Sequence, residues 1–322
     1  MNKKTKNIFK ITLPLLLGVF LVWYSLSKVS IEELVEYAKN ADYTWIILGV
    51  FLGLLSHLSR AYRWLFMLEP MGYKIKFGNS VMAVFATYLI NYTIPRAGEV
   101  ARASIIANYE DVPFEKGFGT IVAERIADLI VMFGIIGITL FLQFDFIYAF
   151  LIEKFNPIKI LIVLFGCVLL SIFFFRFVKK SNSKIALKIR TFVGGLIEGA
   201  LSIFKMKKKW AFIFHTLFIW GMYVLMFYVT SFSISELDGI SAGAILIGFI
   251  SASFSIAATN GGIGSYPLAI YAAFSIFGIP EDPSIAFGWI MWASQTLMLI
   301  ICGGLSLIYL PIYNRNKVSK SA

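Results

Sequence analysis

Cysteine and histidine are scarce in this chain of 322 residues, which contains two of each. Cys167 and Cys302 each lie inside an apolar run, where a thiol behaves as a small hydrophobe, so a framework of disulfide bonds is not indicated. His57 and His215 show no HExxH spacing, and no CxxC pair accompanies them. The sequence therefore predicts neither a metal site nor a bound cofactor.

Charged residues are also few, at 15% against 59% hydrophobic residues, and the mean hydropathy is +0.80. A water-soluble domain could not carry so much apolar surface, so the bilayer is the expected solvent. The net charge of +11 arises from lysines and arginines gathered in a few connecting segments, as in cytoplasmic loops, so no nucleic-acid partner is expected. P-loop, nucleophile-elbow and paired-carboxylate patterns are missing, so we do not expect an enzyme.

Six segments are long and apolar enough to cross a bilayer, which takes about 20 apolar residues. The first has four lysines at or before its start, at positions 3, 4, 6 and 10, but precedes no A-x-A cleavage pattern, so a retained span is favoured over a signal peptide. We predict an all-α polytopic membrane protein with a single transmembrane domain, residues 1–322. The six predicted spans are roughly 8–27, 43–68, 117–142, 157–178, 210–233 and 283–312.

Two further apolar regions, about 79–107 and 241–278, are each interrupted near the middle. The interruptions read TIPRAG at residues 93–98 and NGGIGSYP at residues 260–267. Proline removes a backbone donor and glycine lowers the free energy needed to leave the helix, so each region is predicted to be two short helices joined by a broken tip. Because bare backbone cannot face lipid, we interpret both as re-entrant hairpins buried in the bundle.

Basic residues in the connections predict the topology, because they stay on the cytoplasmic side. Segment 176–209 carries ten basic residues and one acid, whereas the connections at 32–42, 236–238 and 281–282 are acid-rich. Both termini are then cytoplasmic, and the two hairpins are inverted relative to each other, as in transporters with discontinuous helices. Residues 181–209 are predicted to form a cytoplasmic amphipathic segment.

Charged side chains at membrane depth need a partner or a purpose, because inserting each one costs at least about 2.5 kcal/mol. Arg60 and Arg63 lie one helical turn apart, with His57 one turn earlier. They either contact a lipid headgroup or reach back to the cytoplasmic interface, a region in which Tyr62 and Trp64 would also be favoured.

A second cluster follows the first tip, where Arg96, Glu99 and Arg102 are spaced three residues apart. We predict a half-helix that starts at Pro95, with all three on one face. Its free N–H groups and the Arg96 guanidinium would suit a lipid phosphate, because guanidinium groups form paired hydrogen bonds with phosphate oxygens. The alternative is an internal pair of arginine and glutamate that holds the hairpin.

The third cluster is Glu124, Arg125 and Asp128, with the two acids one turn apart. These acids are the best complements in the sequence for the arginines of the first hairpin. Three roles remain open: a charge network that braces the fold, a relay that rearranges when substrate enters, and a carboxylate that takes up protons. In the second tip, glycines would let backbone approach a ligand, and Ser265 is a candidate helix cap.

Four motifs occur in order along the chain: RAYRW at 60–64, PRAGEVAR at 95–102, AERIAD at 123–128 and GGIG at 261–264. Together they resemble the lysylphosphatidylglycerol synthase transmembrane-domain family, the flippase-like membrane proteins. The resemblance covers nearly the whole chain and implies movement of phosphate-linked lipids between leaflets. The family's synthases add a C-terminal aminoacyl-transferase domain, so lipid aminoacylation is not expected from this chain alone. Pro267 stands where many relatives have a glutamate, which puts any role of that acid in doubt.

The sequence and the resemblance together favour a lipid flippase of the cell (plasma or inner) membrane that moves an anionic, phosphate-containing lipid. Two alternatives stay open: the membrane subunit of a lipid-modifying enzyme encoded separately, and a transporter of small solutes or ions. A homodimer is compatible with the sequence. The candidate substrate-binding residues are Arg60, Arg63, Arg96, Gly98, Glu99, Arg102, Glu124, Arg125, Asp128, Asn260, Gly261, Gly262 and Gly264.

Overall fold

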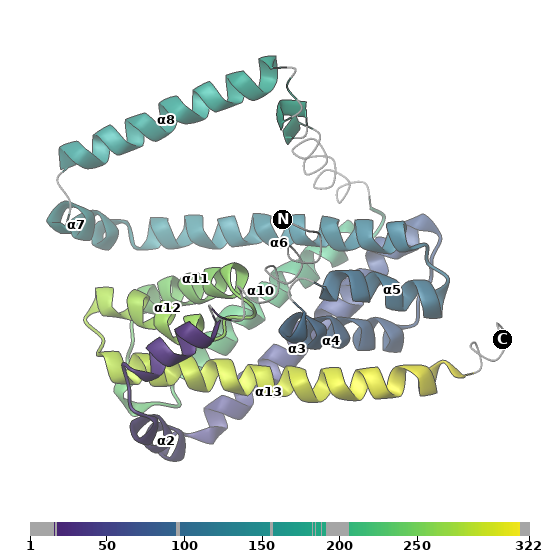
Figure 1. Cartoon of the computed structure of the whole chain (residues 1–322), viewed down its shortest axis with the longest axis horizontal. Helices are drawn as coiled ribbons and strands as arrows, with labels where there is room; N and C mark the ends of the chain where they lie inside the picture. Colours follow the sequence, from purple (N-terminus) through teal and green to yellow (C-terminus); the bar gives the residue numbers. More distant parts are fainter. Residues whose placement is uncertain are drawn as a thin grey trace. The chain divides into compact units, whose positions relative to one another are not determined.

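A computed structural model describes residues 16, 18–94, 97–154, 157–181, 183, 185–187, 189–190 and 206–315. Every regular element within these residues is helical (Figure 1), which confirms the predicted all-α class. Residues 18–26 form the first described helix. The longer elements that follow are α2 Ile31–Asn40, α3 Tyr43–Leu68, α4 Phe77–Thr93, α5 Gly98–Glu110, α6 Phe114–Leu142, α7 Phe144–Lys154, α8 Pro157–Lys180, α10 Lys209–Ser231, α11 Ala242–Ala258, α12 Ser265–Phe274 and α13 Glu281–Tyr313.

Four helical stretches are long and apolar enough to cross a membrane: Tyr43–Met71, Phe114–Leu142, Lys209–Ser231 and Glu281–Tyr313. They confirm four of the six predicted spans. The predicted span at 157–178 coincides with α8, several of whose side chains lie outside the described residues. The predicted span at 8–27 and the amphipathic segment at 181–209 lie largely outside them.

Two helices, α2 and α7, occupy segments for which no helix was predicted. In α2 the Ser30 hydroxyl accepts a hydrogen bond from the Glu33 N–H at 3.1 Å, and the Ser30 N–H donates to the Glu33 carboxylate at 3.0 Å. This is a capping box, which satisfies two amides at the start of the helix and lowers the pKa of Glu33. The S-x-x-E spacing of residues 30–33 is the sequence signal for it.

The chain divides into two compact units, Met1–Ile121 with Trp210–Ala322, and Val122–Lys209. Each is described by itself, and the single domain expected from the sequence stays a prediction. The first unit holds both interrupted regions. Each is a pair of packed helices, α4 with α5 and α11 with α12, as the broken-helix prediction requires.

Helix α13 is the axis on which the first unit is built, and it packs against α2, α3, α4 and α12 (Figure 1). Near its end, Asn314 exchanges two amide hydrogen bonds with Asn79 at the start of α4, at 2.9 and 2.7 Å. Tyr92, in the last turn of α4, bonds Thr296 in the middle of α13. Helix α4 therefore follows the second half of α13.

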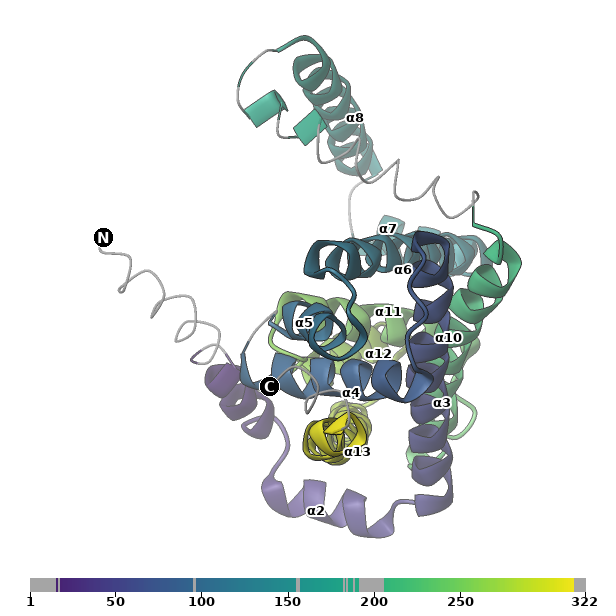
Figure 2. The same ribbon diagram turned by 90° about the vertical axis from the view of Figure 1, so that its right-hand side faces the viewer.

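The other hairpin follows the first half of α13. Gly288 lies directly against Pro267 in the first turn of α12. At the beginning of α13, Glu281 pairs with Lys28 at 3.4 Å and raises the pKa of that lysine. The two hairpins therefore approach α13 from opposite ends and break near its middle. Viewed along α13, α4 lies on one side of it and α2 on the other (Figure 2).

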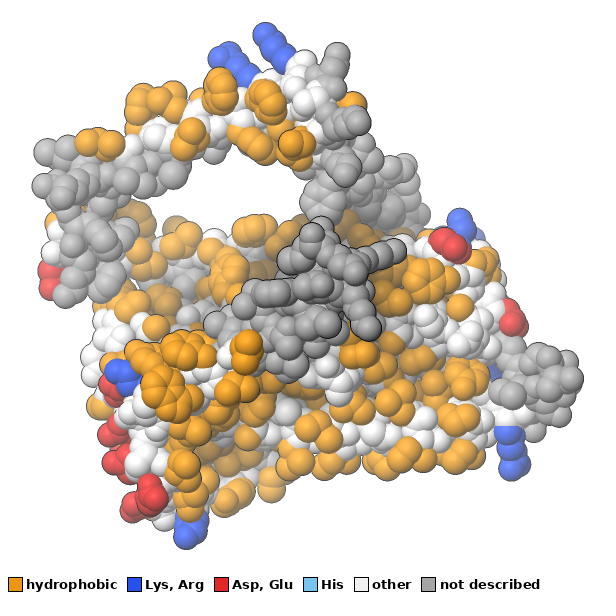
Figure 3. Space-filling view, viewed as in Figure 1, with side chains coloured by type: hydrophobic (Ala, Val, Ile, Leu, Met, Phe, Trp, Pro, Cys, Tyr) orange, Lys and Arg blue, Asp and Glu red, His pale blue; other side chains and the backbone are white. Residues whose placement is uncertain are grey.

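The surface of α13 is apolar along its length. Leu297, Ile301, Leu305 and Ile308 are each more than half exposed. On the face shown in Figure 3, hydrophobic side chains cover this helix, and acidic side chains gather beside α2 at the end where α13 begins. An apolar wall between charged ends is the surface expected of a membrane-embedded bundle.

Gly98 permits the close approach of α4 and α5, and we expect Gly98→Ala to destabilise the protein. A Cβ at this position would meet the Thr87 carbonyl oxygen and come within 2.8 Å of the Asn91 side chain. Overpacking of this kind costs roughly 1–3 kcal/mol. The measurement is the midpoint of thermal unfolding in detergent.

The matched control is Gly119→Ala in α6, where nothing lies within 4 Å of the added Cβ. Alanine there should leave stability unchanged or raise it by up to about 1 kcal/mol, because alanine favours the helix. Equal midpoints for the two variants would contradict the proposed close packing.

Candidate functional site

Arg102 of α5 stacks on Trp64 of α3, with 3.9 Å between the guanidinium carbon and the centre of the indole ring. Both side chains are almost completely buried, at 1% and 0% exposure. The indole N–H donates to the Thr120 hydroxyl of α6 at 2.8 Å, which fixes the ring in its plane. Stacking on an aromatic face stabilises a cation away from water. Trp64 is thus the platform on which this arginine is held.

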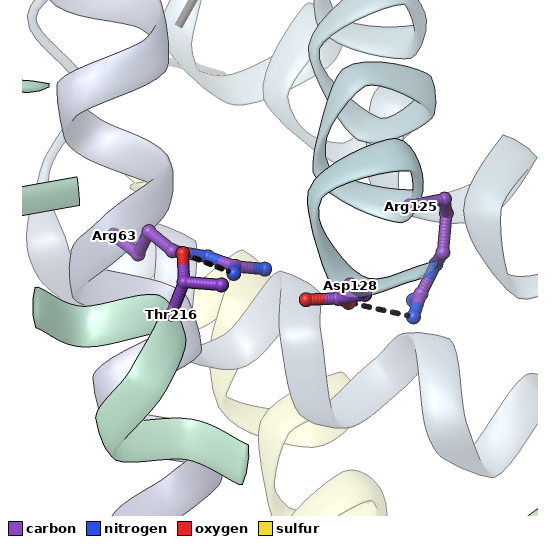
Figure 4. Close-up of polar contacts among 4 residues, drawn as sticks. All are labelled: Arg63, Arg125, Asp128 and Thr216. Carbon is purple, nitrogen blue, oxygen red and sulfur yellow. Dashed lines mark hydrogen bonds and ion pairs between the residues drawn. The ribbon is translucent and has the colours of Figure 1, made fainter. Parts of the chain in front are cut away.

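Arg63, the neighbour of Trp64, is also fully buried. Its Nη1 donates to the Thr216 hydroxyl of α10 at 2.8 Å, as Figure 4 shows, and its guanidinium lies 5.3 Å from the ring centre of Phe212. Arg60 is only 3% exposed. These positions do not support the alternative in which the two arginines reach back to the interface. The structure brings Arg60, Arg63 and Arg102 into the interior of the first unit.

The predicted start of the half-helix at Pro95 is wrong, because α5 begins at Gly98 with Ala97 as its N-cap. Arg96 precedes this cap in the sequence. Pro95 and Arg96 themselves lie outside the described residues. The amide of Gly98 donates to the Asn91 side chain at 2.8 Å, so an internal group occupies the first N–H of the helix. Glu99 is half-buried in the first turn.

The third charged cluster lies on α6 in the second unit. Arg125 Nη1 and the Asp128 carboxylate are 3.5 Å apart (Figure 4), and the arginine is exposed while the aspartate is largely buried. Glu124 is fully buried. Because the two units are described separately, the pairing of these acids with the hairpin arginines stays a prediction.

The tips of the two hairpins lie against each other on α13. Asn260 donates from its side-chain amide to the Tyr92 carbonyl at 3.2 Å, which ties the second tip to the end of α4. Trp292 of α13 donates from its indole N–H to the Gly261 carbonyl at 2.8 Å. Tyr92, Asn260 and Gly261 are thereby gathered against the middle part of α13. Among the predicted residues of the second tip, Asn260 and Gly261 make these contacts directly.

Three glycines shape the second tip. Gly261, Gly262 and Gly264 have φ angles of 67°, 79° and 68°, a region that residues with a Cβ rarely adopt. A Cβ on Gly264 would also meet the backbone of Leu21 and Val22 in the first helix. The prediction that these glycines release the backbone from the helix is confirmed.

The role predicted for Ser265 is wrong. Gly264 is the N-cap of α12 and provides no side-chain bond, while Ser265 is the first helical residue. Its hydroxyl instead bonds the hydroxyls of Ser255 at 2.6 Å and Thr259 at 2.9 Å. These bonds close the hairpin between the end of α11 and the start of α12.

Several residues of the site were not identified from the sequence. Trp64 stood inside a motif but was interpreted as an interfacial aromatic, and its contact with Arg102 depends on tertiary packing. No sequence pattern indicated a role for Tyr92, Thr120, Thr216 or Trp292. Among the described residues, no group of three or more His, Cys, Asp or Glu side chains converges to hold a metal ion.

A family profile described as the lysylphosphatidylglycerol synthase TM region matches residues 11–304. UPF0104 membrane protein MJ1595 of Methanocaldococcus jannaschii is 24% identical over 312 aligned residues, with 87% of this chain and 88% of that protein covered. Glycosyltransferase AglD of Haloferax volcanii is 27% identical over 110 residues, which cover 34% of this chain and 18% of that protein. No solved structure matches.

The bond from Trp64 to Thr120 predicts that Thr120→Val lowers stability. Valine keeps the shape of threonine but leaves the buried indole N–H without its acceptor, which costs about 1–3 kcal/mol. The unfolding midpoint in detergent should fall accordingly.

Thr139→Val is the matched control. Both threonines donate to a carbonyl of their own helix, Thr120 to Gly117 at 2.7 Å and Thr139 to Ile135 at 2.8 Å, and both are 2% exposed. Only the Thr120 change affects the platform, so a similar loss in both variants would refute the role given to this bond.

Proposed function

This chain belongs to the lysylphosphatidylglycerol synthase transmembrane-region family and is an integral, multi-pass membrane protein, and from that premise we propose that it moves an anionic, phosphate-containing lipid between leaflets. The observation that carries the proposal is the burial of Arg102 on the Trp64 platform and of Arg63, the residue before Trp64, inside a unit that contains membrane-spanning helices. Arginine at this depth is expensive, and such residues mark substrate pathways.

The chemistry of the two arginines suits a phosphate group. Stacking on Trp64 covers one face of the Arg102 guanidinium, whereas its N–H donors lie in the plane of the group. Phosphate oxygens accept such donors in pairs, and the bond is strong where water is excluded. The headgroup would be bound by Arg60, Arg63 and Arg102, with Arg96 close to the same hairpin, while the acyl tails remain in the bilayer.

The hairpins supply the route in this proposal. Both α4–α5 and α11–α12 enter the membrane without crossing it, from opposite sides, and their tips meet at its middle. Discontinuous helices that meet at the midplane are typical of transporters in which two parts move about one site. The contacts of Asn260 with Tyr92 and of Trp292 with Gly261 support this arrangement.

The topology that belongs to this proposal places both termini in the cytoplasm and the protein in the plasma or inner membrane. In a variant with both native cysteines replaced by serine, Lys207→Cys should react with a membrane-impermeant maleimide only after the cells are opened. Glu36→Cys should react in intact cells. The reversed pattern would overturn the orientation, because lysine-rich segments stay inside.

A second function is favoured by the partial match to glycosyltransferase AglD. In this alternative the chain is the membrane component that presents a lipid to a separate lipid-modifying enzyme. The same arginines would hold the phosphate, and no transfer of the whole lipid between leaflets would be needed.

Lipid scrambling in proteoliposomes distinguishes the two functions. We expect wild-type protein to move a fluorescent phosphatidylglycerol across the bilayer, and Arg102→Lys to slow it at least tenfold. Lysine keeps the charge but loses the planar donors, and one paired hydrogen bond is worth about 1.5–3 kcal/mol. Arg96→Ala tests the other arginine of the same cluster, and Glu124→Gln tests the cluster on α6.

Arg176→Ala is the matched control, because this arginine is exposed at the end of α8 and lies outside the proposed site. It should scramble lipid at the wild-type rate. Each variant must first elute as a folded species in detergent. A wild-type protein that binds anionic lipid without moving it would favour the presenting role over the flippase.

A further inference from the structure

An apolar groove of about 500 Å³ lies between α3 and α13, on the side where α2 crosses. Its floor is Val50, Met298 and Cys302, which pack against the core cluster of Phe85 and Leu299. Its rim is exposed, at 56% for Tyr43, 59% for Leu297 and 51% for Ile301. The complete lining is Ala38, Tyr43, Ile46, Val50, Ile290, Ser294, Leu297, Met298, Ile301 and Cys302.

We propose that this groove binds one acyl chain of a zwitterionic phospholipid from the leaflet on the acidic side of the membrane. The inference does not depend on the transport proposed above. It concerns a second lipid site, one that recognises a tail rather than a phosphate and lies on the opposite half of α3 from Arg63 and Trp64.

The lining offers nothing to a polar ligand. The Tyr43 hydroxyl donates to the Ala38 carbonyl at 2.7 Å, and the Ser294 hydroxyl donates to the Met291 carbonyl at 3.1 Å. The other lining side chains are aliphatic or carry sulfur. Since α3 and α13 are both membrane-spanning helices, the hydrocarbon of the bilayer fills the space beside them. A concave apolar surface in that setting is shaped for a chain of methylene groups.

The length of the groove matches one leaflet. Its lining on α13 runs from Ile290 to Cys302, which is about 18 Å at 1.5 Å per residue. The hydrocarbon core of a bilayer is about 30 Å thick, so one leaflet contributes about 15 Å. The groove begins at Ala38 and Tyr43, beside the capped helix α2, where the chain passes from the interface into the membrane. A single extended acyl chain from that leaflet spans this distance.

The net negative charge of α2, the helix that contributes Ala38 to the groove, favours one kind of headgroup at this end of the membrane. Helix α2 carries Glu32, Glu33 and Glu36 against Lys39. An anionic headgroup would be repelled there, whereas a zwitterionic one presents its ammonium to the acids. The same acids also argue against a second copy of this chain as the occupant of the groove. A two-fold contact through the groove would bring two acidic α2 helices together, and like charges facing each other cost free energy.

The test uses phosphatidylcholine with a diazirine at the end of one acyl chain, in vesicles that hold the full-length protein. After illumination, peptide mass spectrometry locates the adducts. We expect them to concentrate on residues 46–50 and 294–302. Leu305 and Ile308 on the same helix are at least as exposed as the rim, so they report general contact with lipid. Adducts spread evenly over these positions in the wild-type protein would overturn the proposal.

Ser294→Phe should fill the groove and reduce its adducts several-fold relative to those at Leu305 and Ile308. Leu305→Phe, which places a phenylalanine on the same helix outside the groove, should leave the ratio of groove adducts to those at Ile308 unchanged. A probe built on phosphatidylglycerol should label the groove more weakly than phosphatidylcholine. Protein-to-protein cross-links through residues 294–302 in place of lipid adducts would show a second copy to be the occupant and would refute the acyl-chain site.

Discussion

Backbone hydrogen bonding at the two helix breaks is the constraint on which the first unit depends. The chain is an integral membrane protein, and a break that faced lipid would leave amides and carbonyls without partners. The structure answers this by placing both breaks at one location and supplying partners from side chains. Asn91 accepts from the Gly98 amide, Asn260 donates to the Tyr92 carbonyl, and Trp292 donates to the Gly261 carbonyl. Each break is thus stabilised partly by its own hairpin and partly by the other hairpin or by α13.

Burial of the arginines follows the same logic. A guanidinium removed from water needs a surface that stabilises its charge, and α3 provides one in Trp64. The indole in turn needs an acceptor for its N–H, which Thr120 provides. Three helices are therefore linked through one side chain at the level of the arginines. Movement of α5 relative to α3 would disturb the stacking of Arg102 on the indole.

The sequence predicted the helical class, the long spans and the two interrupted regions, because hydropathy and the positions of proline and glycine are local signals. It placed the start of α5 at Pro95, since proline favours a first turn. The helix instead begins at Gly98, where the Asn91 side chain takes the first amide. Contacts such as that of Trp292 with Gly261 join residues 31 positions apart in the sequence, and no local sequence pattern predicts them. The capping box of α2 was local and readable, but the acids were interpreted only as marks of topology.

The two proposed lipid sites lie on the same helix, α3, and require different behaviour from it. The groove uses Tyr43 to Val50 of α3, whereas the platform uses Arg60 to Trp64, about 20 Å further along between Val50 and Arg63. Helix α13 is held to α4 by the paired Asn79 and Asn314, and Gly303 lies directly against Leu89. A lipid tail resting between α3 and α13 would add to that rigid frame. In the proposed function, motion that admits a headgroup then comes from elements that do not line the groove. Helix α5, which carries Arg102 and is joined to α4 through the first tip, is one such element.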